Sequence, residues 1–139
     1  MNIVIIEDNQ DHARILKWAF EQNGRNDHLA FFPDPTIALD FIEGAVRDGA
    51  FSADLIILDL NLPKIDGRTV LQKLKSDDST RTIPVIVLSS SEREDDVRKA
   101  YQLGANTYIS KALLLDQISS RLNMILEYWA NIAQLPSRK

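Results

Sequence analysis

The chain has 139 residues, of which 45% are hydrophobic and 26% are charged, as is typical of one globular domain with a sizeable core. It has no cysteine and a net charge of −4 with scattered Lys and Arg, so disulfides, thiolate metal sites and a nucleic-acid-binding surface are not expected. No apolar run approaches the ~20 residues of a membrane span, and the N-terminus lacks signal-peptide features, so we expect a cytoplasmic protein without membrane contact.

Five short apolar runs predict five β-strands, over residues 3–6, 29–32, 55–58, 85–88 and 107–109. Four of these runs are apolar on consecutive residues, which is typical of strands buried on both faces of a parallel sheet. Pro84 stands at the start of the fourth strand, where a strand tolerates proline.

The segments between the runs carry helix signals. Asp34 and Pro35 are typical of an N-cap followed by a first helical residue, and Ser91 with Glu94 spells a capping box. Left-handed residues that end helices are expected at Gly24 and Gly104.

The last segment predicts one extended amphipathic helix over about residues 116–133. Its apolar residues recur at steps of four and three: Ile118, Leu122, Ile125, Trp129 and Ile132. Because strands and helices alternate, we expect an α/β fold with a doubly wound parallel sheet and right-handed crossovers. One domain is expected to span residues 1–139.

Polar residues follow the predicted strands at the edge where such sheets bind ligands. They are Glu7, Asp8, Asp34, Asp59, Ser89 and Lys111. Singly, each has a structural explanation as a cap, a turn residue or a solvated lysine, and Asp34 is expected only to cap. Together, three carboxylates would repel unless Mg²⁺ and the lysine balanced their charge. A phosphoryl group on an aspartate would find the positioning and charge neutralisation that phosphoryl transfer needs.

These residues resemble the receiver domain of two-component response regulators, over nearly the whole chain. The resemblance is carried by Glu7-Asp8, by Asp59 within Leu58-Asp59-Leu60-Asn61-Leu62-Pro63, by Asp66-Gly67, by Ser89, and by Tyr108 three residues before Lys111. It implies the flavodoxin-like strand order 2-1-3-4-5, with strands one and three adjacent. Lys111 would then reach across two strand spacings, or ~10 Å.

The resemblance also implies the chemistry of the acid cluster. Asp59 would accept a phosphoryl group from a histidine kinase or a small acyl phosphate. Asp8, Asp59 and the backbone carbonyl of Asn61 would bind Mg²⁺, with Glu7 helping through water. Such a protein is a switch and not an enzyme, beyond catalysing its own phosphorylation and dephosphorylation.

Three further roles are implied beside the acids. Lys111 would contact the phosphoryl oxygens, Ser89 would be drawn towards the phosphoryl group, and Tyr108 would turn inward behind it. The sequence departs from the family at Glu7, where aspartate is commoner, and at Ala112, where proline usually follows the lysine. We expect a trans bond between Lys111 and Ala112, because cis bonds before non-proline residues cost ~3–4 kcal/mol.

A closer resemblance is to single-domain regulators paired with bacterial phytochrome kinases. It rests on residues 58–67 and on the tail 127–136. Output is then expected through protein contacts. The tail carries Tyr128, Trp129, Ile132 and Leu135, and an apolar overhang of this kind usually marks an interface, so we expect a homodimer. The alternative is that the tail folds back on its own domain.

Three other functions compete with a phosphorylated receiver. A flavodoxin-like cofactor binder would need a phosphate loop where residues 7–12 are acidic. A phosphatase with an aspartate nucleophile would be expected to carry a second aspartate at position 61, which is Asn. A degenerate receiver would bind partners without phosphorylation. His12 and His28 lack partners at metal-ligand spacing and are predicted to be surface or boundary residues.

Overall fold

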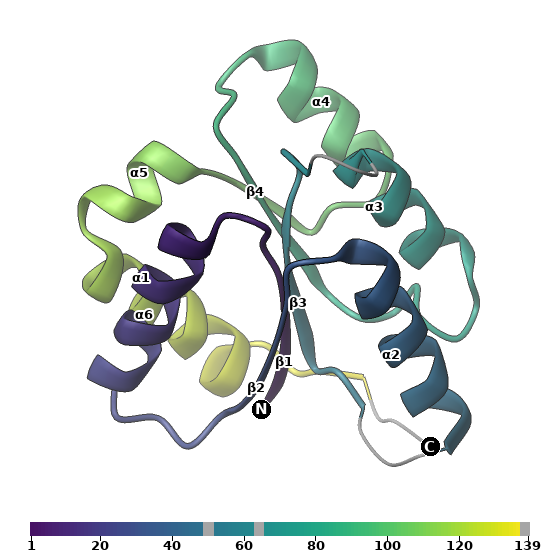
Figure 1. Cartoon of the computed structure of the whole chain (residues 1–139), viewed down its shortest axis with the longest axis horizontal. Helices are drawn as coiled ribbons and strands as arrows, with labels where there is room; N and C mark the ends of the chain where they lie inside the picture. Colours follow the sequence, from purple (N-terminus) through teal and green to yellow (C-terminus); the bar gives the residue numbers. More distant parts are fainter. Residues whose placement is uncertain (49–51, 63–65, 137–139) are drawn as a thin grey trace.

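The computed structural model describes residues 1–48, 52–62 and 66–136. Its centre is a parallel sheet with the order β2-β1-β3-β4-β5 (Figure 1). The strands are β1 (Asn2–Ile6), β2 (His28–Phe32), β3 (Leu55–Asp59), β4 (Val85–Ser89) and β5 (Thr107–Ser110). The predicted doubly wound α/β fold and the strand order 2-1-3-4-5 are confirmed.

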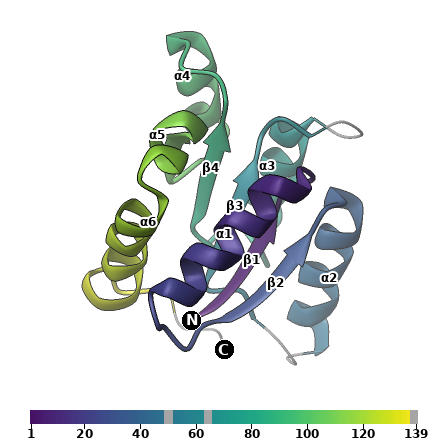
Figure 2. The same cartoon turned by 60° about the vertical axis from the view of Figure 1, so that its left-hand side comes forward.

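Helices cover both faces of the sheet (Figures 1 and 2). One face carries α1 (Gln10–Gln22), α5 (Lys111–Asp116) and α6 (Ile118–Glu127), and the other carries α2 (Pro35–Asp48), α3 (Gly67–Ser76) and α4 (Glu94–Gln102). A π-helical turn, η1 (Tyr128–Ile132), continues α6. Within the described ranges, no helix is long and apolar enough to cross a membrane.

Two apolar clusters, one on each face, form the core. Along β1, Ile3 and Ile5 point into the cluster under α1 and α6, whereas Val4 and Ile6 point into the cluster under α2 and α3. All four side chains are fully buried. The consecutive apolar runs of the sequence are therefore explained by burial of both faces, as in other parallel sheets.

Two of the predicted helix signals are confirmed. Asp34 caps α2, because this helix begins at Pro35 and the Asp34 carboxylate accepts a hydrogen bond from the Thr36 amide at 2.8 Å. The left-handed conformations of Gly24 and Gly104 are also present, at φ +62° and +105°.

The capping box predicted at Ser91 and Glu94 is wrong. Helix α4 begins at Glu94, and its N-cap residue Arg93 makes no side-chain capping bond. The Ser91 hydroxyl instead donates to Asp96 at 2.5 Å and accepts from the Arg93 amide. The backbone amide of Ser91 bonds the Ser89 hydroxyl, so this residue belongs to the loop that follows β4 and not to the helix.

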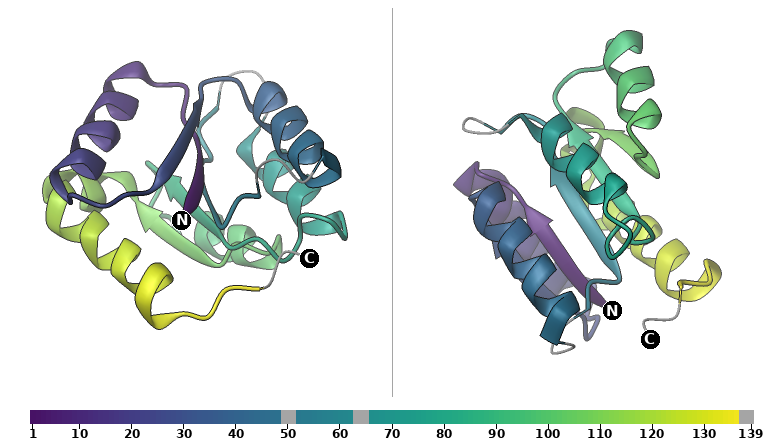
Figure 3. Two further views of the ribbon diagram at one scale, coloured as in Figure 1. Left: turned by 90° about the horizontal axis from the view of Figure 1, so that it is seen from below. Right: turned by 90° about the vertical axis from the view of Figure 1, so that its right-hand side faces the viewer.

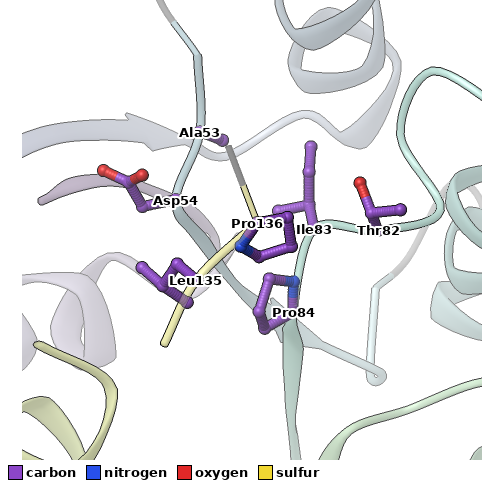
Figure 4. A pocket seen from close by; sticks show the side chains of 7 residues that line it. All are labelled: Ala53, Asp54, Thr82, Ile83, Pro84, Leu135 and Pro136. Carbon is purple, nitrogen blue, oxygen red and sulfur yellow. The ribbon is translucent and has the colours of Figure 1, made fainter. Parts of the chain in front are cut away.

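The end of the chain differs in detail from the single helix predicted over residues 116–133. A short helix, α5, follows β5 directly, and the backbone at Gln117 leaves helical geometry before α6 begins. After η1 the chain folds back, and Leu135 and Pro136 lie against Ala53 and Pro84 at the start of β3 and β4 (Figures 3 and 4). Trp129 packs on the core, whereas Ile132 is 73% exposed.

Candidate functional site

The ends of two adjacent strands bring three acids together. Glu7 and Asp8 follow β1, and Asp59 ends β3, which pairs with β1 so that Ile6 lies beside Leu58. One oxygen from each acid lies within 4.8 Å of the others. Glu7 and Asp59 are only 4% and 1% exposed, so their charges are largely removed from water.

A lysine from the far edge of the sheet reaches into this cluster. Lys111 is the first residue of α5, and its Nζ lies 2.9 Å from Asp59 Oδ2 and 2.9 Å from Glu7 Oε1. The side chain is buried, although it carries a charge. The peptide bond between Lys111 and Ala112 is trans, as the sequence predicts.

The pKa values of the three buried groups, Glu7, Asp59 and Lys111, are shifted in different directions. Burial, followed by contact with Asp59, raises the pKa of Glu7 to about 7. Burial works against ionisation of Asp59 too, but bonds with Glu7, Lys111 and the Asn61 amide outweigh it and lower the pKa of Asp59. Burial likewise opposes the ammonium of Lys111, but its two carboxylate partners raise the pKa of this lysine. The preferred state is an Asp59–Lys111 ion pair beside a Glu7 that ionises reluctantly.

The acid cluster has the chemistry of a divalent metal site. Its donors are carboxylate oxygens, which are the ligands that Mg²⁺, Mn²⁺ and Ca²⁺ prefer. Glu7 Oε1 is buried and makes an ion contact with Lys111, yet it has no hydrogen-bond partner within the described part of the chain. The pKa of Glu7 is raised chiefly by burial and then by its contact with Asp59, and a cation near these oxygens would favour the ionised carboxylate against both effects.

Asn61 connects Asp59 to the loop after β4 by hydrogen bonds. Its backbone amide donates to Asp59 Oδ1 at 2.8 Å. Its side-chain oxygen accepts from the amide and hydroxyl of Ser90 at 3.0 and 3.1 Å, and lies 3.5 Å from the hydroxyl of Ser89. Ser89 is the buried last residue of β4 and directly follows Leu88, the strand partner of Asp59.

Tyr108 on β5 lies behind the same loop. Its hydroxyl donates to the carbonyl oxygen of Ser91 at 2.8 Å, and its ring packs against the core cluster under α3. The amide of Ser91 donates to Ser89 Oγ at 3.1 Å. Ser89 and Tyr108, which the sequence singled out separately, are therefore joined through one intervening residue.

Two sets of residues at the site were not found from the sequence. His12, predicted to be a surface or boundary residue, is half-buried, and its Nδ1 lies 3.1 Å from Lys111 Nζ. Arg68 on α3 donates to Asp96 on α4 at 2.7 Å, across a cleft beside Asn61. The first could have been noticed because His12 falls in the first turn of the helix that follows Glu7 and Asp8. The second depends on helix packing, which the sequence does not reveal.

The fold and this acid cluster define a class of protein, and comparison with known proteins agrees. The response regulator receiver domain family matches residues 3–123, so the chain belongs to that family. Its sequence is 36% identical over 127 residues to the probable methanogenesis regulatory protein FilR2 of Methanothrix harundinacea, covering 91% of this chain and 82% of that protein.

Two solved structures of response regulators are also similar. The phosphorylated cyanobacterial phytochrome response regulator RcpA has a TM-score of 0.87 and 38% identity, with 98% of each chain covered. The Mn²⁺-bound form of response regulator Rcp1, a protein of Synechocystis sp., has a TM-score of 0.85 and 31% identity, with 98% of this chain and 99% of that chain covered. This chain is thus a receiver domain homologous to phytochrome response regulators. Receiver domains of this family are signalling switches and not conventional enzymes.

Proposed function

We propose that this receiver accepts a phosphoryl group on Asp59 in a Mg²⁺-dependent reaction. The observation that carries the proposal is the buried Asp59 carboxylate, held at the end of β3 with Lys111 Nζ 2.9 Å away and two further acids beside it. A carboxylate oxygen would attack phosphorus while the P–N bond of a phosphohistidine breaks. The leaving imidazole nitrogen keeps the bonding electron pair and takes up a proton.

Each neighbouring residue has a distinct part in this proposal. Asp8, Asp59 and the backbone carbonyl of Asn61 would hold Mg²⁺, with Glu7 acting through water. The bound ion supplies positive charge that neutralises the phosphoryl oxygens. Lys111 supplies a second positive charge next to Asp59, since its long side chain already spans the distance from β5.

Ser89 and Tyr108 would change position when Asp59 is phosphorylated. A phosphoryl group on Asp59 offers oxygens that can accept from the Ser89 hydroxyl, which now lies 3.5 Å from Asn61 Oδ1. If Ser89 turns towards that group, the loop that holds Ser91 and Tyr108 adjusts with it. Output then passes through protein contacts made by the adjusted surface.

Mass spectrometry would test the acceptor directly. Incubation with acetyl phosphate and Mg²⁺ should add one phosphoryl group, and Asp59→Asn should abolish the addition. Asp40→Asn, which changes an exposed acid on α2, is the matched control and should be labelled like the unmodified protein. Full labelling of the Asp59→Asn variant would contradict the proposal.

The phosphoryl donor we propose is the kinase of a bacterial phytochrome. The proposal is supported by the similarity over almost the whole chain to the phytochrome response regulator RcpA and to the bacteriophytochrome response regulator AtBRR. Autophosphorylated kinases from the same organism, each incubated with this protein, should lose label at different rates. The phytochrome kinase should lose it first; faster transfer from an unrelated sensor kinase would exclude this pairing.

We further propose a homodimer that uses the outer surface of α5, α6 and η1. Apolar side chains are exposed there, including Leu113, Met124 at 70% and Ile132 at 73%. Patches of this kind commonly mark interfaces. Light scattering should give a dimer mass that falls to a monomer mass in Met124→Glu or Ile132→Glu. The control Ile37→Glu alters another exposed isoleucine, on α2 at the opposite face, and should stay dimeric.

A further inference from the structure

The ammonium of Lys111 has three close neighbours, and one of them is not an acid. Its Nζ lies 2.9 Å from Asp59 Oδ2, 2.9 Å from Glu7 Oε1 and 3.1 Å from His12 Nδ1. His12 stands 99 positions away in the sequence, in the first turn of α1. An ammonium group has three N–H bonds and no acceptor, so Lys111 can donate to Asp59 and to His12 while it makes an ion contact with Glu7.

The direction of the bond to His12 follows from this chemistry. Because Lys111 can only donate, Nδ1 of His12 must offer its lone pair, and the proton of the neutral ring is therefore on Nε2. The alternative, a proton on Nδ1 directed at Glu7, is less consistent with the geometry. The distance from Nδ1 to Glu7 Oε1 is 3.6 Å, and the N–H would face the ammonium at 3.1 Å.

The surroundings leave Lys111 no other neutral acceptor in this direction among the described residues. The small cavity at this point is lined by Glu7, His12 and Lys111 and otherwise by leucines, namely Leu16, Leu88, Leu114 and Leu115. Without the imidazole, one N–H of a buried ammonium would face apolar side chains, which is costly for a charged donor.

We propose that His12 is a positioning residue that holds the Lys111 ammonium beside Asp59 for phosphoryl transfer. The inference rests on the proposed function of Asp59. During that reaction both carboxylate partners of Lys111 change, because Asp59 gains a phosphoryl group and Glu7 faces a metal ion. The bond to His12 involves neither acid, so it keeps the ammonium in place while the other two contacts are rearranged.

Two variants of His12 distinguish a role in positioning Lys111 from a role in stabilising the fold. His12→Leu removes the acceptor, whereas His12→Asn retains one near the position of Nδ1. Loss of one hydrogen bond to a charged group is expected to slow loading from acetyl phosphate about tenfold in His12→Leu, and His12→Asn should recover most of the rate. His28→Leu is the matched control, since His28 is exposed at the start of β2 and should load normally.

A second measurement needs no phosphorylation. In unphosphorylated, metal-free protein, the ¹⁵N signal of the Lys111 ammonium, assigned with Lys111→Met, should be present in the unmodified protein and in His12→Asn. It should be broadened or shifted in His12→Leu. The ring ¹⁵N shifts of His12 in the unmodified protein should show the proton on Nε2.

The outcomes distinguish the two proposals. A proton on Nδ1, or a Lys111 signal and a loading rate that are both unchanged in His12→Leu, would overturn the role of His12. If no variant and not even the unmodified protein takes up a phosphoryl group, the function proposed for Asp59 fails, while the Lys111 signal still tests the contact with His12.

Discussion

Replacing Glu7 by glutamine should stabilise the metal-free protein above neutral pH. The glutamine side chain has the size and the hydrogen-bonding groups of a protonated glutamate, so the variant mimics the neutral form permanently. The pKa of Glu7 rises from an ordinary 4.5 to about 7 in the folded protein, chiefly because the side chain is buried. The folded state therefore binds this proton more tightly than the unfolded state does.

The size of the effect follows from that difference. A change from 4.5 to about 7 corresponds to ~3 kcal/mol, at ~1.4 kcal/mol for each tenfold change in proton affinity. For a raised carboxyl pKa, the stabilising contribution is complete below pH 4.5 and is lost as the pH rises through 7. Above that pH the unmodified protein should be less stable than Glu7→Gln by ~3 kcal/mol, or roughly 10 °C in Tm.

Urea unfolding in EDTA, followed by tryptophan fluorescence at several pH values between 5 and 8, measures this difference. The lowered pKa of Asp59 has the opposite effect on stability, but Asp59 stays ionised between pH 5 and 8, so the pH dependence in this range comes from Glu7. Glu21→Gln, at an exposed position on α1, is the control and should follow the unmodified protein. Parallel stability curves for the unmodified protein and Glu7→Gln across this pH range would refute the reasoning.

Three further changes have expected results. Lys111→Met should slow loading from acetyl phosphate by about a hundredfold, measured by mass spectrometry, because electrostatic stabilisation of the transferring group is lost. Gly67→Ala should destabilise the protein by at least ~2 kcal/mol in urea unfolding, since its Cβ would lie 2.5 Å from Leu60 Cα. Tyr108→Phe, which loses the bond to the carbonyl of Ser91, should cost ~1 kcal/mol in the same assay without abolishing phosphorylation.

The parts of the site that the sequence predicted are those fixed by the ends of strands. Glu7, Asp59 and Ser89 each follow an apolar run, and the carboxyl ends of parallel strands meet at one edge of the sheet whatever the side-chain details. Hydrophobic periodicity is sufficient to locate such ends, although the strand order itself came from resemblance to a family. Whether these residues perform the roles assigned to them stays a prediction.

The parts that the sequence missed depend on where helices begin and how they pack. Ser91 and Glu94 have the spacing of a capping box, but the Ser91 hydroxyl bonds Asp96 and the helix begins three residues later. The place of His12 in the first turn after the acids is readable from the sequence, but its contact with Lys111 depends on α1 and α5 lying on the same face. The fold-back of Leu135 onto the start of β3 and β4 likewise depends on contacts between distant segments.

The hydrogen bonds beyond Asp59 indicate which surface of the receiver can respond to phosphorylation. Asn61 joins the acceptor directly to the loop after β4, and that loop is fixed in turn to Tyr108 and, through Asp96, to Arg68 on α3. A second connection runs through Lys111, since the neighbouring Ser110 on β5 donates to Glu92 in the same loop. These contacts all lie towards α3, α4 and β5. On the other face, α1 and α6 pack on the sheet mainly through buried apolar residues, which transmit little from a rearranged polar loop. The polar contact on that face, between Lys111 and His12, is the one proposed to stay in place during the reaction. We therefore expect phosphorylation to alter the surface of α4 and β5 first, while the face that carries α1 remains a fixed platform.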